Sequence, residues 1–325
     1  MNPDPAPLAT RLLKAEPAAL ADAGMVLRAG GLVAFPTETV YGLGADATSG
    51  TAVAKIYAAK ERPQFNPLIA HVPDLAHAQR EGCFNAQALA LAQAFWPGPL
   101  TLVVPVAPTC SVSDLARAGL DSVALRVPAH PVAQALLRAA GCPVAAPSAN
   151  RSGRVSPTLA LHVMGDLEGR IDMVLDGGPT QVGVESTIVA CLDDGIHLLR
   201  PGGIAREDIE RVIGATLTSP PQTGAVTAPG MLASHYAPNA QLRLDATHIE
   251  TDEAVLDFGG RFADVQAASF DLSPRGDLAE AASNLFAFLR ALDATGARTI
   301  AVAPIPHEGL GEAIRDRLAR AAAPR

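Results

Sequence analysis

Two cations and an amide lie close together in the segment KERPQFN, at residues 60–66. The segment follows a predicted helix over 51–60 and precedes a predicted strand over 68–72. Lys60, Arg62 and Asn66, in a loop that prolines stiffen, suit a phosphate or carboxylate ligand. The alternative is that the two cations only complement the dipole of the helix. We favour the ligand site; His71, near the end of the next strand, is on its own more typical of a packed or surface histidine.

A third cation interrupts an apolar strand. Arg126 belongs to the segment SVALRVP, at residues 122–128, where small apolar residues predict a buried strand over 123–127. A buried charge is costly unless it is paired or bound to an anion. The sequence leaves two partners open for Arg126: a carboxylate of the protein itself, or the carboxylate of a substrate.

Four further segments place polar side chains beside predicted strands. They are PTETVYGLG at 36–44, APSANRSGRVSPT at 146–158, GVESTIV at 183–189 and LLRPG at 198–202. Polar groups at strand ends commonly build ligand sites in α/β sheets, and a loop rich in hydroxyls and amides can bind phosphates without a Walker sequence. Ordinary turns and solvated loops are the alternative for each segment taken alone.

Several familiar motifs are missing. The sequence has no G-x-x-x-x-G-K-[ST], H-E-x-x-H or G-x-S-x-G, so an ATP site would have to work without a P-loop. The segment GLGADA at 42–47 fits G-x-G-x-x-A, but six residues separate it from the preceding strand, which disfavours a nicotinamide or flavin site. The four cysteines form no C-x-x-C, and no histidine pair completes a zinc spacing, so we predict no metal site built by the protein.

The composition indicates a globular protein without a strong affinity of its own for nucleic acid. Of the 325 residues, 49% are hydrophobic and 18% charged, enough for a sizeable core. The net charge is −8, and residues 241–325 alone carry 9 Lys/Arg against 13 Asp/Glu. Neither residues 1–240 nor residues 241–325 carry the excess of Lys and Arg that binding to nucleic-acid phosphates needs. The start of the chain lacks a signal-peptide pattern, and no apolar run reaches 18 residues, so we expect a cytoplasmic protein without a membrane span.

Alternating helices and strands predict an α/β fold. We expect helices over 10–30, 51–60, 131–140 and 158–167, and strands over 32–35, 68–72, 102–106, 123–127, 144–146, 173–175, 187–191 and 197–199. Residues 215–240 are rich in proline, glycine, serine and threonine and are predicted to be a linker. Beyond it, strands over 255–258 and 299–303 and helices over 278–292 and 311–322 predict a small α/β domain. The predicted domains are therefore 10–214 and 241–325.

Eight stretches, in order along the chain, resemble the L-threonylcarbamoyladenylate synthases in their long, two-domain form. They are FPTETVYGLGADA, KERPQFNPLIAHV, FWPGPLTLV, ALRVPAHP, APSANRSGRVSPT, DGGPTQVGVESTIV, LLRPGGI and, in the linker, APGMLASHYAP. Any one stretch is weak, but eight in the family's order are highly specific. The resemblance implies a YrdC-like twisted mixed sheet with a concave site, joined to a smaller Rossmann-like α/β domain at the C-terminus.

The resemblance also implies a reaction. L-threonine, bicarbonate and ATP, with Mg²⁺, give L-threonylcarbamoyl-AMP and pyrophosphate. A partner transferase then moves the threonylcarbamoyl group to the adenosine next to the anticodon in certain tRNAs. No covalent enzyme intermediate is needed, so the protein's tasks are positioning and charge stabilisation.

The family's functional residues can be carried over onto matching positions. The threonine contacts fall on Thr39, His71, Arg126, Ser148 and Ser186. The ATP contacts fall on Arg62, Asn66, Ser122, Ala146, Asn150, Ser156, Arg200 and Tyr236. Lys60 and Arg62 are the expected catalytic residues, and residues 229–238 of the linker are expected to form a lid that brings Tyr236 to ATP.

Three rival functions are weaker. A non-catalytic RNA-binding module fits poorly with the acidic charge balance. A carbamoyl-transfer enzyme that uses carbamoyl phosphate would carry acylphosphatase-like and zinc-finger regions, which this sequence does not show. A nicotinamide enzyme is disfavoured by the spacing of GLGADA.

Overall fold

The computed structural model describes residues 8–63, 66–218 and 235–324. Its first part forms, in chain order, β1 (Arg11–Lys14), α1 (Pro17–Arg28), β2 (Val33–Pro36), β3 (Tyr41–Asp46), α2 (Gly50–Lys60), β4 (Ile69–His71), α3 (Leu75–Glu81), α4 (Ala86–Phe95), β5 (Leu100–Pro105), α5 (Asp114–Arg117), β6 (Ser122–Arg126), α6 (Pro131–Ala140), β7 (Val144–Ala145), α7 (Ala160–Leu167), β8 (Met173–Asp176), β9 (Thr187–Leu192), β10 (Gly195–Arg200) and α8 (Arg206–Ile213). The second part forms β11 (Gln241–Arg243), β12 (Glu253–Asp257), β13 (Ser269–Asp271), α9 (Leu278–Asp293), β14 (Thr299–Val302) and α10 (Leu310–Ala322).

The helix predicted over 10–30 is wrong in its first third. Residues Arg11–Lys14 form β1, which pairs in parallel with β8 at the edge of the large sheet. The helix α1 begins only at Pro17. Proline has no backbone N–H and a fixed φ, so it fits the first position of a helix but not its interior. The apolar spacing of residues 12–13 therefore belongs to a strand rather than to the helix.

All but the last residue of the segment GLGADA lies in β3, which pairs antiparallel with β2. A Cβ on Gly44 would sit 2.9 Å from the Phe35 ring and 2.9 Å from a methyl of Val144. Gly44 is thus required by close packing between neighbouring strands, not by a turn around a dinucleotide. The glycines of this segment therefore do not form the strand-to-helix turn that a nicotinamide site requires.

The large sheet is mixed, as the resemblance implies. Within the described residues it has ten strands in the order β1-β8-β2-β3-β7-β4-β6-β5-β9-β10. Strands β4 and β6 run parallel at its centre, with His71 directly opposite Arg126 at their C-terminal ends. The register therefore brings two of the predicted site residues side by side.

Both faces of the sheet are covered. In β2, Ala34 joins the main core, whereas Val33 and Phe35 face the core that α1 and α6 cover. A strand that is buried on both faces reads as a continuous apolar run, which is how 32–35 was predicted. Around β4, β5, β6 and β9, a small cluster of buried residues includes Ile69, which also lines a cavity.

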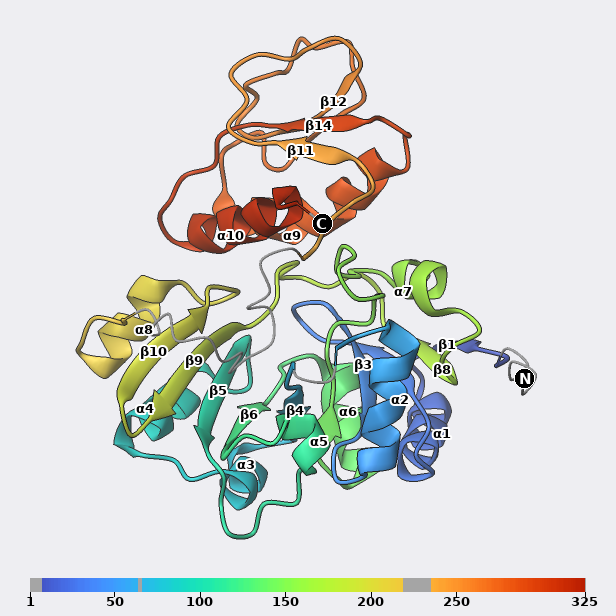
Figure 1. Cartoon of the computed structure of the whole chain (residues 1–325), viewed down its shortest axis with the longest axis vertical. Helices are drawn as coiled ribbons and strands as arrows, with labels where there is room; N and C mark the ends of the chain where they lie inside the picture. The colour runs from blue at the N-terminus through green and yellow to red at the C-terminus, as the bar shows by residue number, and fades with distance from the viewer. Residues whose placement is uncertain (1–7, 64–65, 219–234, 325) are drawn as a thin grey trace.

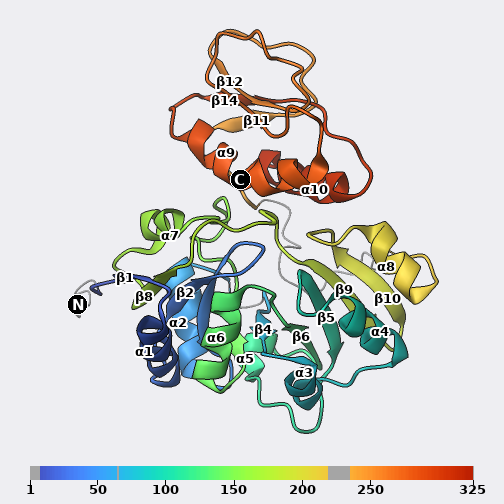
Figure 2. The same cartoon turned by 180° about the vertical axis from the view of Figure 1, so that it is seen from behind.

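The C-terminal domain is a separate layer above the large sheet (Figure 1). Its four described strands are all parallel, in the order β11-β14-β12-β13. Helices α9 and α10 lie between this sheet and the first domain, as both views show (Figures 1 and 2). The parallel strands and covering helices are those of a Rossmann-like α/β domain. The predicted fold class is confirmed for both parts of the chain. Of the predicted linker 215–240, residues 219–234 lie outside the described residues.

We expect Gly44→Ala to lower the stability of the fold. The added methyl meets Phe35 and Val144 inside a packed sheet, so the cost should be about 1–3 kcal/mol. Gly50→Ala is the matched control, because it begins α2 with no atom within 4 Å of its added Cβ. Thermal unfolding should show a lower Tm for the first variant only; equal Tm values would contradict the packing role of Gly44.

Candidate active site

A small cavity lies at the C-terminal ends of β4 and β6. Its volume is about 50 Å³. It is lined by all five predicted threonine contacts and by four of the predicted ATP contacts: Thr39, His71, Arg126, Ser148 and Ser186, then Arg62, Ala146, Arg200 and Tyr236. These residues are up to 197 positions apart in the sequence. The fold thus gathers most of the predicted site in one place.

Arg126 has an internal carboxylate partner, one of the two partners that its sequence left open. Its Nη2 donates to Oε1 of Glu38 at 2.7 Å and to Oγ1 of Thr39 at 3.0 Å. Burial alone raises the pKa of Glu38, but the charge of Arg126 and the hydrogen bonds that the carboxylate accepts together hold that pKa below its usual range. The Nε of Arg126 is buried and has no partner among the described residues. One edge of the guanidinium is therefore held by the protein, and the Nε donor is left for a ligand.

His71 is a neutral hydrogen-bonding group. Burial, together with the charge of Arg126, lowers its pKa to about 3. Its Nδ1 lies 3.2 Å from the carbonyl oxygen of Ile69. A carbonyl can only accept, so Nδ1 carries the proton and Nε2 of the neutral ring is an acceptor. His71 can then accept a hydrogen bond from a hydroxyl or an ammonium group.

Arg62 lines the cavity and Asn66 does not, although Nη2 of Arg62 lies 3.5 Å from the carbonyl oxygen of Asn66. The Nη2 of Arg62 donates to the carbonyl of Pro67 at 3.2 Å, and burial lowers its pKa to about 10. Its Nε and both polar atoms of the Asn66 side chain are buried without a partner among the described residues. Unsatisfied buried polar groups are costly, so their clustering points to a ligand that completes them.

Lys60 lies behind the cavity rather than in its lining. Its Nζ donates to the carbonyl oxygens of Ser148 and Asn150, each at 2.5 Å. Burial and the nearby Arg62 charge lower its pKa well below the usual value. The Asn150 amide in turn donates to the carbonyls of Arg151 and Arg154, while its Oδ1 has no partner among the described residues. Lys60 therefore fixes the shape of the 148–150 loop.

Arg200, the last residue of β10, is tied to the start of β9. Its Nη2 donates to the carbonyl oxygen of Ser186 at 2.8 Å and to its hydroxyl at 3.2 Å. The Ser186 hydroxyl also lies 2.8 Å from that of Thr101 in β5. Burial lowers the pKa of Arg200. Arg200 and Ser186, predicted for different substrates, therefore form one connected wall.

Ser122 and Ser156 do not line the cavity. Ser122 begins β6 and Arg126 ends it, which puts them about 13 Å apart along an extended strand. The parallel register places Ser122 near the N-terminal end of β4, which Asn66 precedes in the sequence. Ser156 instead donates to Oε1 of Glu185 at 2.5 Å.

Four residues of the site were not predicted from the sequence. Glu38 and Glu185 belong to the polar segments 36–44 and 183–189, but neither segment indicates that its glutamate binds an arginine. His235 lines the cavity beside Tyr236, and the two rings make an edge contact with centroids 4.1 Å apart. Arg317 comes from α10 and donates to Oε2 of Glu185 at 2.7 Å. No local pattern in a C-terminal helix reveals a contact of this kind.

Two family models cover nearly the whole chain. The Sua5/YciO/YrdC model, described as telomere recombination, matches residues 25–202, and the model of the threonylcarbamoyl-AMP synthase C-terminal domain matches residues 204–323. The chain belongs to the threonylcarbamoyl-AMP synthase family. The resemblance found in the sequence is confirmed. As a member of this family, the chain is a transferase that makes threonylcarbamoyl-AMP.

Individual relatives agree along their full length. Threonylcarbamoyl-AMP synthase from Bacillus subtilis is 44% identical over 93% of this chain and 92% of the relative. The enzyme of that name from Pyrococcus abyssi is 42% identical over 91% of each. The crystal structure of P. abyssi Sua5 complexed with L-threonine superposes with a TM-score of 0.88 at 38% identity, covering 97% of both chains. Both domains of the threonylcarbamoyl-AMP synthase family are thus present in this chain.

The described residues contain neither a membrane-spanning helix nor a cluster of potential metal ligands. None of their helices is long and apolar enough to cross a bilayer. No group of three or more His, Cys, Asp or Glu side chains among them is arranged to hold a metal ion.

We expect Arg126→Gln to weaken threonine use selectively. Loss of one charge-assisted hydrogen bond costs about 1.5–3 kcal/mol, so the threonine KM should rise roughly 10- to 150-fold. The change also leaves Glu38 buried without its partner, so Arg126→Gln combined with Glu38→Gln separates binding from folding. Steady-state kinetics with varied threonine checks this; an unchanged threonine KM in both variants would remove Arg126 from the threonine site.

Proposed function

We propose that the chain condenses L-threonine, bicarbonate and ATP into L-threonylcarbamoyl-AMP and pyrophosphate, the first stage of a tRNA modification next to the anticodon. The observation that carries this proposal is a group of buried cations, two of which line the cavity while the third holds the 148–150 loop beside it. Lys60, Arg62 and Arg200 are all buried, and burial lowers the pKa of each. Cations desolvated in this way are best stabilised by an anionic ligand.

The chemistry requires two bond-forming steps. The amine of threonine adds to bicarbonate with loss of water, which gives an N-carboxylate. An oxygen of this carboxylate attacks the α-phosphorus of ATP, the bond between the α- and β-phosphates breaks, and pyrophosphate leaves with the electron pair. The protein supplies no nucleophile to this sequence, so its contribution is orientation and charge stabilisation.

Threonine fits the half of the cavity that contains Arg126. The free Nε of Arg126 is a donor for the substrate carboxylate, and Nε2 of His71 is an acceptor for its hydroxyl or ammonium group. Thr39, Ser148 and Ser186 add polar groups around the same space. A solved relative is described as complexed with L-threonine, which supports this substrate.

The phosphates of ATP fit the half that contains Arg62 and Arg200. Lys60 contributes its charge from behind the 148–150 loop, and Asn66, Ala146, Asn150, Ser156 and Ser122 are the remaining proposed contacts along that side. These cations would offset the charge that moves onto pyrophosphate as it leaves.

Mg²⁺ is proposed to enter with ATP. The only carboxylate that lines the described cavity, Glu185, already accepts from Arg317 and Ser156. The donor set therefore fits an ion held by phosphate oxygens and water, which is how Mg²⁺ usually binds beside a nucleotide, and not a cage built by the protein. When bound, the ion would supply further neutralisation of phosphate charge.

The lid prediction has support in the size of the cavity. A volume of about 50 Å³ is much smaller than the roughly 300–1,000 Å³ of small-molecule sites, so part of the wall must move to admit ATP. His235 and Tyr236 belong to the predicted linker and line the cavity. We propose that this segment, 229–238, opens and closes over ATP; its residues 229–234 lie outside the described part of the chain.

A second enzyme is required to use the product. A mixed anhydride of a carbamate and AMP hydrolyses readily, so we propose that a partner transferase takes it on to tRNA in the cytoplasm. The acidic balance of the chain argues against strong binding of tRNA by this protein alone.

The decisive experiment measures pyrophosphate release by purified protein with ATP and Mg²⁺, with threonine and bicarbonate omitted in turn. Release that requires both substrates would support the proposal. Release that is indifferent to threonine would contradict it, and a salt-dependent tRNA shift without nucleotide turnover would favour the RNA-binding rival instead.

Lys60→Ala should lower kcat more than it raises the threonine KM. The variant removes a buried charge near the phosphates and the two hydrogen bonds that shape the 148–150 loop. Lys55→Ala in the same helix is the control, because Lys55 is exposed and bonds only to the carbonyl of Gly30 in the described structure. Equal turnover in both variants would reject the role of Lys60.

A further inference from the structure

Arg317 is the largest fully buried side chain among the described residues. It projects from α10 of the C-terminal domain to residues of the first domain. Its Nε donates to Oε2 of Glu185 at 2.7 Å, and its Nη2 donates to the carbonyl oxygen of Pro201 at 3.0 Å. Its Nη1 bonds to the neighbouring Asp316 at 2.6 Å. All three nitrogens of the guanidinium are thus committed, each to a different acceptor.

Two residues that line the cavity, Glu185 and Tyr236, contact this guanidinium. Glu185 lines the cavity, and its second oxygen accepts from Ser156. Tyr236 lines it as well, and the central carbon of Arg317 lies 5.2 Å from the centroid of its ring, a cation–π geometry. Tyr236 also stacks on Phe286 of α9, with ring centroids 5.6 Å apart. The position of Tyr236 is therefore set by side chains of the C-terminal domain.

Glu185 is ionised because of the same contacts. Burial alone raises its pKa, but the charges of Arg317 and Arg200 together hold that pKa below the usual range. A buried carboxylate without Arg317 would either take up a proton or lose its fixed direction. Either change would disturb Ser156 and the nearby Arg200, both of which belong to the proposed ATP side.

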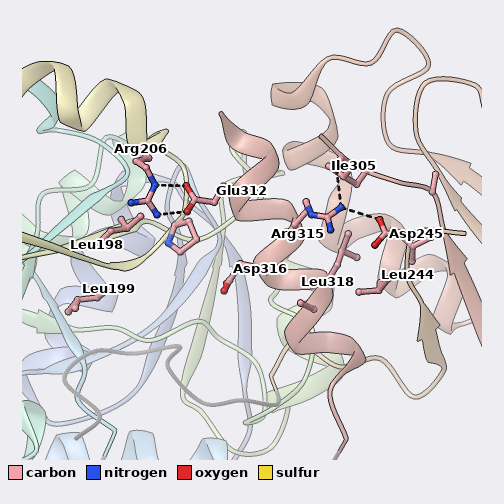
Figure 3. Close-up of a pocket in the computed structure, with 14 residues that line it drawn as sticks. Leu198, Leu199, Arg206, Leu244, Asp245, Ile305, Glu312, Arg315, Asp316 and Leu318 are labelled. Atoms are coloured by element: carbon pink, nitrogen blue, oxygen red, sulfur yellow. Dashed lines mark hydrogen bonds and ion pairs between the residues drawn. The ribbon is translucent and has the colours of Figure 1, made fainter. Parts of the chain in front are cut away.

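Two other ion pairs between the domains are described, Arg206 with Glu312 and Arg290 with Asp166, and none of these four residues lines the catalytic cavity. Arg206 of α8 pairs with Glu312 of α10 at 2.5 Å, beside a cavity of about 480 Å³ between the domains (Figure 3). Figure 3 shows both side chains at the boundary between the domains. Neither of them lines the catalytic cavity. In the described structure, the charged side chains around the larger cavity bond to one another or to neighbours, so it presents no free charge to a ligand. This pair therefore joins the domains without touching the site.

We propose that Arg317 is a positioning residue for the reaction: by holding Glu185 and Tyr236, it makes the C-terminal domain a working part of the ATP side of the active site. The inference rests on the proposed use of ATP. A buried ion pair is by itself a weak source of stability, so its presence here is better explained by the geometry that it imposes. Arg317 touches no substrate and acts only through its two neighbours.

The test compares three variants with one control. Arg317→Met keeps the bulk of the side chain and removes its charge; Arg317→Lys restores the charge; Arg317→Met with Glu185→Gln removes the stranded carboxylate. Arg206→Met is the control, because it breaks an ion pair between the same two domains. KM for ATP and for threonine, kcat and Tm are measured for each by pyrophosphate release and thermal unfolding.

We expect Arg317→Met to raise the ATP KM by about tenfold or more, while the threonine KM changes less than about twofold. Arg317→Lys should recover part of the loss. Arg206→Met should lower Tm without changing either KM. A merely structural role would lower Tm and leave both KM values unchanged in all variants, which would overturn the inference. Should Arg317→Met not fold, Arg317→Lys and the double variant carry the same comparison.

Failure of the inference is distinct from failure of the proposed function. If the unaltered protein releases no pyrophosphate in a threonine-dependent manner, the proposed function fails before any variant is compared. If it does so and the Arg317 variants behave like Arg206→Met, only the role of Arg317 is rejected.

Discussion

The burial of several cations around one cavity is the constraint on which the rest of the structure depends. Lys60, Arg62 and Arg200 are all almost removed from water, and Glu185 is the one carboxylate that lines the described cavity. Charges in this setting cost free energy unless an anion or a full set of hydrogen bonds compensates them. Backbone carbonyls meet part of this cost, and we propose that the anionic substrates meet the rest. Folding thereby prepares a site whose electrostatics favour phosphates and carboxylates before any ligand arrives.

The two domains share this site through packing as well as charge. The core of the C-terminal domain continues into the first domain through Val40, Val155 and Val184, and it includes Tyr236. A Cβ on Gly183 would come within 2.3–2.5 Å of the backbone of α9, so only glycine permits this approach. The segment that carries Glu185 and Ser186 therefore contacts α9 through Gly183, Arg317 of α10 through Glu185, and Arg200 of β10 through Ser186. This packing joins the second domain to the segment that contributes Glu185 and Ser186 to the cavity.

Local patterns predicted much of the fold and the polar part of the site. The helix over 131–140 and the strands around Arg126 follow directly from apolar spacing, and a charge within an apolar strand identified Arg126 itself. The rest depends on tertiary contacts. Strand β1 is defined by its pairing with β8 and β3 by its packing against Phe35, neither of which has a local signature. The bond between Glu185 and Arg317 joins residues 132 positions apart, so no spacing rule could find it.

A crystal structure with L-threonine and a non-hydrolysable ATP analogue tests most directly whether the buried cations form the substrate site. The threonine carboxylate is predicted to accept from Nε of Arg126, and the phosphates are predicted to lie within hydrogen-bonding distance of Arg62 and Arg200. With the nucleotide bound, the Tyr236 ring should lie against the Arg317 guanidinium. Ligands bound elsewhere, with Arg62, Arg126 and Arg200 untouched, would contradict the assignment of this cavity as the active site.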